Sequence, residues 1–154
     1  MPNRGFIYLF CPLTKSWSNI ESLFNNLRRN DQYTMNILVC EDNIMTLRAI
    51  EFSLRKAGYN VFKAENGHQG IEILGEEEID LVITDINMPY TKGLELIRHV
   101  NTQLEVKIPV IVISGITNVE TRAHAMELGA EGYLTKPFDP KVMLDLVKSF
   151  SEMN

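Results

Sequence analysis

The chain has 154 residues, of which 45% are hydrophobic and 23% charged, and its net charge is −5 at pH 7. This length suits one domain whose core needs no disulfide or metal to hold it, with room for a short appendage. The negative charge and a sequence pI near 5.2 argue against the basic surface typical of proteins that bind nucleic acids or acidic membranes. We therefore expect neither of these partners.

Residues 1–34 are predicted to form an N-terminal extension, and their sequence does not indicate its role. Residues 6–11 are apolar, but Pro12 ends the run, which is too short to span a membrane and lacks a clear signal-peptide cleavage pattern. Residues 18–29 place apolar side chains at helical spacing. They form either one helix that packs on the domain or a stretch with little structure.

The two cysteines lie far apart in the sequence and in different contexts. Cys40 ends an apolar run, so it is interpreted as a small buried side chain rather than as the disulfide partner of Cys11. A chain without disulfides fits a reducing compartment, and we expect a cytoplasmic protein.

From residue 35 to residue 154, five short apolar runs alternate with five amphipathic segments. The runs predict strands over residues 36–40, 59–64, 79–84, 110–113 and 131–134. The segments predict helices over residues 44–57, 68–74, 93–101, 117–128 and 140–150. This alternation predicts an α/β domain, a parallel sheet with helices on both faces. The doubly wound arrangement that uses five strands is flavodoxin-like, with strand order 2-1-3-4-5.

Acidic residues follow two strands that this order makes neighbours. Glu41 and Asp42 follow the first strand, and Asp85 follows the third, where Pro89 prevents an immediate helix. The carboxyl ends of parallel strands meet at one edge, so these three carboxylates should converge. Three acids in one crevice repel one another unless a cation is present, and a few oxygen ligands favour Mg²⁺. The sequence therefore predicts a magnesium site.

Two further strand ends carry groups that suit a phosphoryl group. Ser114 offers a hydroxyl after the fourth strand, and Lys136 offers a mobile ammonium after the fifth. Together with a metal ion they can neutralise phosphoryl oxygens, and Asp85 is best placed to be the nucleophile. Each residue also has an ordinary interpretation, because Asp85 can cap a turn and Glu41-Asp42 can cap the next helix.

With these residues the chain resembles, from Met35 onward, the receiver domain of two-component response regulators. The matching motifs are Glu41-Asp42, Asp85 with Met88-Pro89 and Gly93, Ser114-Gly115, and Lys136-Pro137-Phe138. The resemblance implies that Asp85 accepts a phosphoryl group from a histidine kinase or a histidine phosphotransfer protein. It also implies that Asp42, Asp85 and the backbone carbonyl of Asn87 hold Mg²⁺, with Glu41 helping directly or through water.

The resemblance also implies how the switch operates. Lys136 would contact the phosphoryl group through a loop in which its bond to Pro137 is cis, and Ser114 would swing toward that group. Tyr133 matches the family's aromatic switch, which turns inward as Ser114 moves. A purely structural role, as a half-buried tyrosine of a strand, accounts for this residue nearly as well.

Partner surfaces follow from the same resemblance. The phosphodonor is expected to dock near Ile44, Met45 and Arg48 and the Pro137-Phe138 loop. The helix over 117–128, the strand over 131–134 and the helix over 140–150 would bind a target protein or support a phosphorylation-dependent dimer. No output domain follows in this sequence, so we expect a stand-alone receiver.

Three other functions are compatible with the same topology. A small phosphatase or hydrolase with Asp85 as nucleophile would usually carry a second acid two residues later, where this chain has Asn87, a side chain suited to orienting a hydrolytic water. A flavin or nucleotide binder would need a glycine-rich loop after the first strand. A scaffold without phosphorylation would not need this complete set of residues. A phosphoacceptor regulator, rather than an enzyme, is therefore the leading hypothesis.

Overall fold

The computed structural model describes residues 34–90 and 92–152. Contacts divide the chain into two units, Met1–Tyr33 and Thr34–Asn154. The helical pattern predicted over residues 18–29 lies outside the described residues, so it stays a prediction. Among the described residues, no helix is long and apolar enough to cross a membrane.

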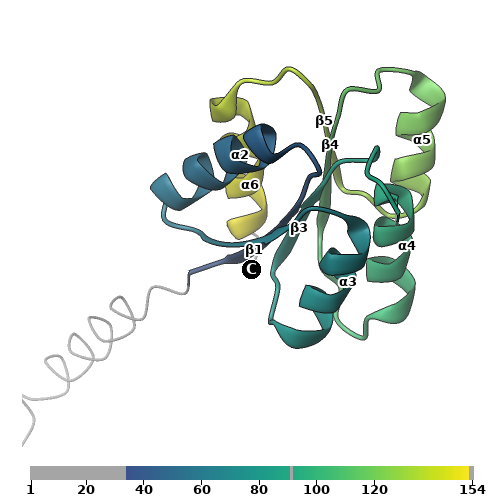
Figure 1. Ribbon diagram of the computed structural model, residues 1–154, viewed down its shortest axis with the longest axis horizontal. Helices are drawn as coiled ribbons and strands as arrows, with labels where there is room; N and C mark the ends of the chain where they lie inside the picture. Colours follow the sequence, from purple (N-terminus) through teal and green to yellow (C-terminus); the bar gives the residue numbers. More distant parts are fainter. Residues whose placement is uncertain (1–33, 91, 153–154) are drawn as a thin grey trace, which may run out of the picture. The chain divides into compact units, whose positions relative to one another are not determined.

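Five parallel strands form one sheet in the order β2-β1-β3-β4-β5, which confirms the predicted topology (Figure 1). The strands are β1 (Asn36–Cys40), β2 (Asn60–Ala64), β3 (Leu81–Thr84), β4 (Val110–Ser114) and β5 (Gly132–Thr135). The helices are α2 (Ile44–Lys56), α3 (Gly67–Glu76), α4 (Gly93–Gln103), α5 (Val119–Glu127) and α6 (Pro140–Ser151). Helices α2 and α6 cover one face of the sheet, and α3, α4 and α5 cover the other (Figure 1). The fold is flavodoxin-like.

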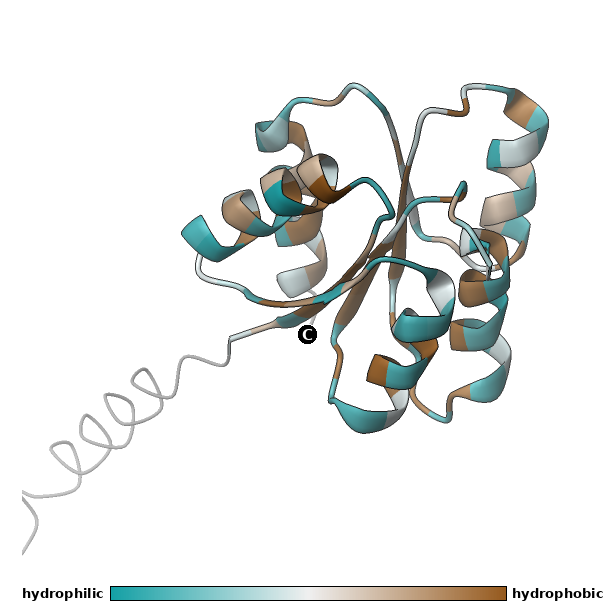
Figure 2. Ribbon diagram, in the orientation of Figure 1, coloured by the Kyte–Doolittle hydropathy of each residue, from teal (hydrophilic) through white to brown (hydrophobic). Residues whose placement is uncertain are grey.

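The sheet separates two hydrophobic clusters because side chains alternate along each strand. In β1, Ile37 and Val39 belong to the cluster on the α2 and α6 side, while Leu38 and Cys40 belong to the other. Every residue of β3 and β4 is buried, as expected for strands covered on both faces. Figure 2 shows hydrophobic residues along the strands and hydrophilic ones on the outer helix faces. The prediction that Cys40 is buried is confirmed, and burial raises the pKa of its thiol to about 12.

Helix starts are set by side-chain caps. Three asparagines each accept a hydrogen bond from the backbone amide three residues later: Asn43, Asn66 and Asn118. The cap at Asn118 explains why α5 begins at Val119 rather than at Thr117, where the helix was predicted to begin. Helix α3 (Gly67–Glu76) is longer than the predicted range of 68–74, and Gly75 lies inside it. Ile44 begins the apolar spacing of α2, but its side chain in the first turn is 49% exposed.

One glycine determines how tightly the loop after β3 can fold. A Cβ atom at Gly93 would lie 1.9 Å from the carbonyl oxygen of Asp85, which only glycine allows. The backbone amide of Gly93 donates to the carbonyl of Ile86 at 3.2 Å. Helix α4 therefore begins directly against the backbone of the predicted phosphoacceptor.

Candidate functional site

The carboxyl edge of the sheet brings together two acids and a lysine from three strand ends. The Nζ atom of Lys136 donates to Asp85 Oδ2 at 2.6 Å and to Glu41 Oε2 at 2.5 Å. The side chains of Glu41 and Asp85 are only 2% and 8% exposed, and that of Lys136 is 24% exposed. Charges this well buried are stable only when paired and hydrogen-bonded, as they are here.

The second oxygen of each acid is held by a backbone amide. Asp85 Oδ1 accepts a hydrogen bond from the amide of Asn87, and Glu41 Oε1 accepts one from the amide of Asn43, both at 3.1 Å. Hydrogen bonds to a charged acceptor are stronger than neutral ones and fix its orientation. Each carboxylate therefore has a fixed orientation, set by a backbone amide on one oxygen and by Lys136 on the other.

Burial and pairing act in opposite directions on the pKa values in this site. Burial raises the pKa of Glu41, and the hydrogen bond and charge of Lys136 offset this only in part. Burial lowers the pKa of Lys136, but its hydrogen bonds to Asp85 and Glu41 and their charges outweigh that effect, so the pKa is raised. The ammonium is thus protonated at neutral pH, and the site holds more acids than this one cation balances.

A third carboxylate completes a group that suits a hard cation. Asp42 is exposed beside the pair, and carboxylate oxygens of Glu41, Asp42 and Asp85 lie within 4.8 Å of one another. Oxygen-only ligands with open space at the surface fit Mg²⁺, which keeps several of its waters. Three carboxylates against the single ammonium of Lys136 leave net negative charge for such an ion. The residues therefore fit the magnesium site that the sequence predicted, and the assignment of ligands stays a prediction.

Ser114 lies at the end of β4 and is fully buried, but its side chain bonds within its own loop. Its Oγ atom accepts a hydrogen bond from the amide of Ile116 at 3.3 Å, and its carbonyl accepts one from the amide of Lys136 at 2.9 Å. Among the described residues, no hydrogen bond joins the Ser114 hydroxyl to the side chains of Asp85 or Lys136. Half-buried Tyr133 donates from its hydroxyl to the carbonyl of Ile116 at 2.8 Å. The role of Ile116 as a shared partner had no signal in the sequence.

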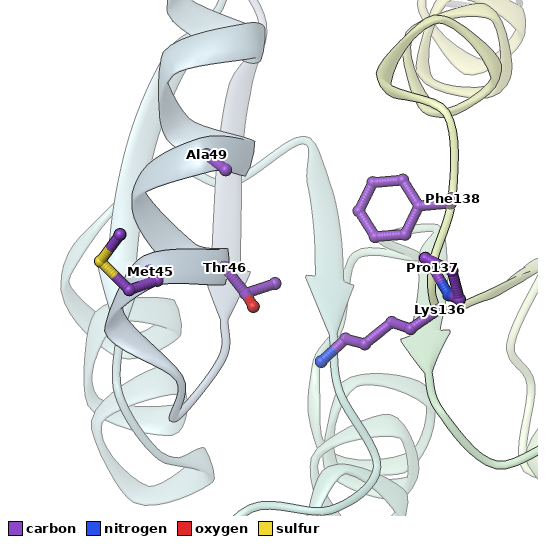
Figure 3. A pocket seen from close by; sticks show the side chains of 6 residues that line it. All are labelled: Met45, Thr46, Ala49, Lys136, Pro137 and Phe138. Atoms are coloured by element: carbon purple, nitrogen blue, oxygen red, sulfur yellow. The ribbon is translucent and has the colours of Figure 1, made fainter.

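A groove of about 530 Å³ opens beside the site between α2 and the loop that follows β5. It is lined by Met45, Thr46, Ala49, Lys136, Pro137 and Phe138 (Figure 3). Figure 3 shows the Phe138 ring on the side of the groove opposite α2. The peptide bond between Lys136 and Pro137 is cis, as the family resemblance implied. Thr46 and Ala49 were not predicted to line the site, although both lie within about one turn after Met45, which was predicted to face a partner.

Comparisons with known proteins identify one family. The model of the response regulator receiver domain matches residues 37–148. The aerobic respiration control protein ArcA of Escherichia coli K12 is 37% identical over 108 residues, which are 70% of this chain and 44% of ArcA. The cell cycle transcriptional regulator CtrA of Caulobacter vibrioides is 29% identical over 110 residues, which are 71% of this chain and 47% of CtrA. The chain spans less than half the length of these relatives, so the stand-alone architecture stays an expectation.

Solved structures show the same fold. A CheY-like receiver from Methanospirillum hungatei is 26% identical, with a TM-score of 0.71 over 77% of this chain and 95% of that one. The beryllofluoride-activated receiver domain of DrrB is 27% identical, with a TM-score of 0.71 over 77% of this chain and 98% of that one. The family model covers more than half of the chain and coincides with the sheet and its acidic edge. The chain therefore belongs to the response-regulator receiver domain family.

Proposed function

We propose that this receiver is a phosphorylation-dependent signalling switch in which Asp85 accepts a phosphoryl group with the help of Mg²⁺. The donor is a histidine kinase or a histidine phosphotransfer protein, and the protein acts in the cytoplasm. One observation carries the proposal: the carboxylate of Asp85 is oriented by Lys136 and the amide of Asn87 beside a cluster of acids. An isolated turn-capping aspartate needs neither the lysine nor the acids.

The proposed reaction moves one phosphoryl group. A carboxylate oxygen of Asp85 attacks the phosphorus of a phosphohistidine, the P–N bond breaks, and the imidazole leaves and takes up a proton. Lys136 has three N–H donors, so it can bond a phosphoryl oxygen while it keeps Glu41. The Ser114 hydroxyl would donate to another oxygen. Mg²⁺ held by Glu41, Asp42, Asp85 and the Asn87 carbonyl would neutralise charge on the phosphoryl oxygens.

The phosphorylated state is proposed to discharge itself. Asn87 follows Asp85 by two residues and is exposed, so its side chain can orient a water toward the acyl phosphate. Attack of that water releases phosphate and restores the carboxylate. The same position argues against a phosphatase that acts on external substrates, because an amide cannot serve as the general acid such an enzyme needs. The protein is therefore a regulator that promotes only its own phosphorylation and dephosphorylation.

We place the docking site of the phosphodonor on the outer surface of α2 and the groove beside Phe138. Met45 and Ile44, at the start of α2, are 76% and 49% exposed although they are hydrophobic. Exposed hydrophobic residues next to a reactive site are typical of protein interfaces. Arg48 lies one turn further along the exposed face and offers a charge for a partner. A donor seated here would bring its histidine close to Asp85.

The output surface is proposed to be the face formed by α5, β5 and α6. Hydrophobic side chains are exposed there on both helices: Val119 is 81% exposed, Met126 43% and Val142 51%. Phosphorylation at Asp85 would reach this face through Ser114, the loop after β4 and Tyr133. A target protein, or a second phosphorylated copy, would bind the altered surface.

The deciding experiment compares three purified proteins in Mg²⁺ with a small phosphodonor. The parent should gain the mass of one phosphoryl group, and Asp85→Asn should gain none. Asp145→Asn removes an exposed carboxylate from α6 and is the matched control, so it should behave like the parent. Equal mass gain in the parent and in Asp85→Asn would remove Asp85 from its role.

A further inference from the structure

An arginine on α5 lies over the aromatic ring of Tyr133. The Cζ atom of Arg122 is 5.5 Å from the centroid of that ring, within the range in which a cation is attracted to an aromatic face. The hydroxyl of the same tyrosine donates to the carbonyl of Ile116 at 2.8 Å. Tyr133 on β5 is thus held at its ring by α5 and at its hydroxyl by the loop between β4 and α5.

The same loop also bonds to Ser114, through Ile116. The carbonyl of Ile116 accepts from Tyr133, while its amide donates to Ser114 Oγ at 3.3 Å. Because the Ser114 oxygen accepts this bond, its hydroxyl hydrogen stays available to donate to a ligand. A continuous series of contacts therefore runs from Arg122 to the hydroxyl at the carboxyl edge of the sheet.

Helix α5 depends on such contacts more than the other described helices. Ala125 is its only buried residue, whereas α2, α3, α4 and α6 each bury three or four. A helix with so little buried surface is held weakly by packing. The position of α5 and of the loop before it should therefore respond to the loss of a single side-chain contact.

We infer that Arg122 is a positioning residue for the switch. It holds Tyr133 in the half-buried position seen here, and through Ile116 it sets the direction of the Ser114 hydroxyl. The last link, in which Ser114 donates to a phosphoryl group on Asp85, rests on the proposed function. Arg122 is exposed, and a contact between an exposed cation and an aromatic ring is worth about two- to fivefold in an equilibrium constant, which sets the expected size of the effect.

The test measures beryllofluoride affinity in Mg²⁺, with beryllofluoride as the phosphoryl analogue. Arg122→Met keeps a long side chain but removes the cation, and it should weaken binding about two- to fivefold. Tyr133→Phe keeps the ring but removes the hydroxyl that reaches Ile116. In the Tyr133→Phe background, Arg122→Met should therefore have no effect. No effect in the parent, or an equal effect in both backgrounds, would overturn the inference, since the second result means that only net charge matters.

A second measurement needs no phosphorylation chemistry. The ring resonances of Tyr133 are assigned by their loss in Tyr133→Phe and followed by NMR in the protein without ligands. Arg122→Met should shift them, Arg122→Lys should shift them less, and Arg98→Met, which removes an exposed arginine from α4, should leave them unchanged. Unchanged resonances in Arg122→Met contradict the inference. A parent that binds no beryllofluoride contradicts the proposed function instead, so the two failures are distinguishable.

Discussion

At the scale of single residues, the charge balance of the site depends on Lys136. Its ammonium is the only described cation that bonds to Glu41 and Asp85, and both acids are nearly inaccessible to solvent. Replacement by Met would leave two buried carboxylates close together without a counter-charge. We expect Lys136→Met to lower the free energy of unfolding by about 1–3 kcal/mol at pH 7.5, measured by urea denaturation without divalent ions. Lys141→Met, at an exposed site on α6, should stay within about 0.5 kcal/mol of the parent.

The pH dependence of the stability lost in Lys136→Met follows from the pKa shifts of Lys136 and Glu41. The raised pKa of Lys136 means that its contribution is complete below the ordinary lysine pKa and is lost only as the pH rises through the raised value. On the acidic side, burial raises the pKa of Glu41, so this carboxylate becomes protonated at a higher pH than an exposed glutamate does. Protonation removes the repulsion in Lys136→Met. The stability deficit should therefore shrink between pH 7.5 and pH 4, and an equal deficit at both pH values would contradict the electrostatic explanation.

At the scale of elements, the start of α4 depends on the absence of a side chain at Gly93. A Cβ atom there would overlap the carbonyl oxygen of Asp85, so the loop and the helix would have to move apart. We expect Gly93→Ala to lower the free energy of unfolding by about 2–3 kcal/mol and to slow phosphorylation of Asp85. Thermal unfolding and the mass-gain assay measure the two effects.

A second glycine gives the matched control for that substitution. A Cβ atom at Gly75, inside α3, would meet no heavy atom within 4 Å. Gly75→Ala should therefore raise the free energy of unfolding by about 0.5–1 kcal/mol, because alanine loses less backbone entropy in a helix. If Gly93→Ala were also stabilising, the close approach of α4 to Asp85 would be wrong.

The elements were largely predictable because strand and helix periods differ and because five strand-helix pairs leave few sheet orders. The position of Asp85 and Lys136 at the carboxyl edge of the sheet was also predictable, because each residue comes directly after a strand. Observed element ends differ from the predicted ones where a side-chain cap sets them, as the cap at Asn118 does for the start of α5. One contact between distant elements was not predictable: the ring of Tyr133 beneath Arg122 depends on how β5 and α5 pack, which no local pattern encodes.

At the scale of the whole molecule, negative charge is concentrated where a cation is expected. The chain carries 20 acids against 15 lysines and arginines, and three of the acids meet at one edge of the sheet. Bringing these acids together on folding costs free energy, because the unfolded chain keeps them apart and hydrated. A divalent ion that binds only the folded state recovers this cost, so the stability of the whole domain is linked to the site.

This linkage predicts that Mg²⁺ stabilises the folded chain. At a free concentration ten times the dissociation constant, one site adds about 1.4 kcal/mol to the free energy of unfolding. The Tm should therefore rise as MgCl₂ is added, while NaCl at equal ionic strength screens exposed charges and should give a smaller rise. Asp42→Asn removes the exposed carboxylate of the cluster without touching the bonds of Lys136, so it should flatten the response to Mg²⁺ and leave the fold intact. An equal rise in Tm for Asp42→Asn and the parent would show that the ion binds elsewhere, and the acids at the carboxyl edge would then need another explanation.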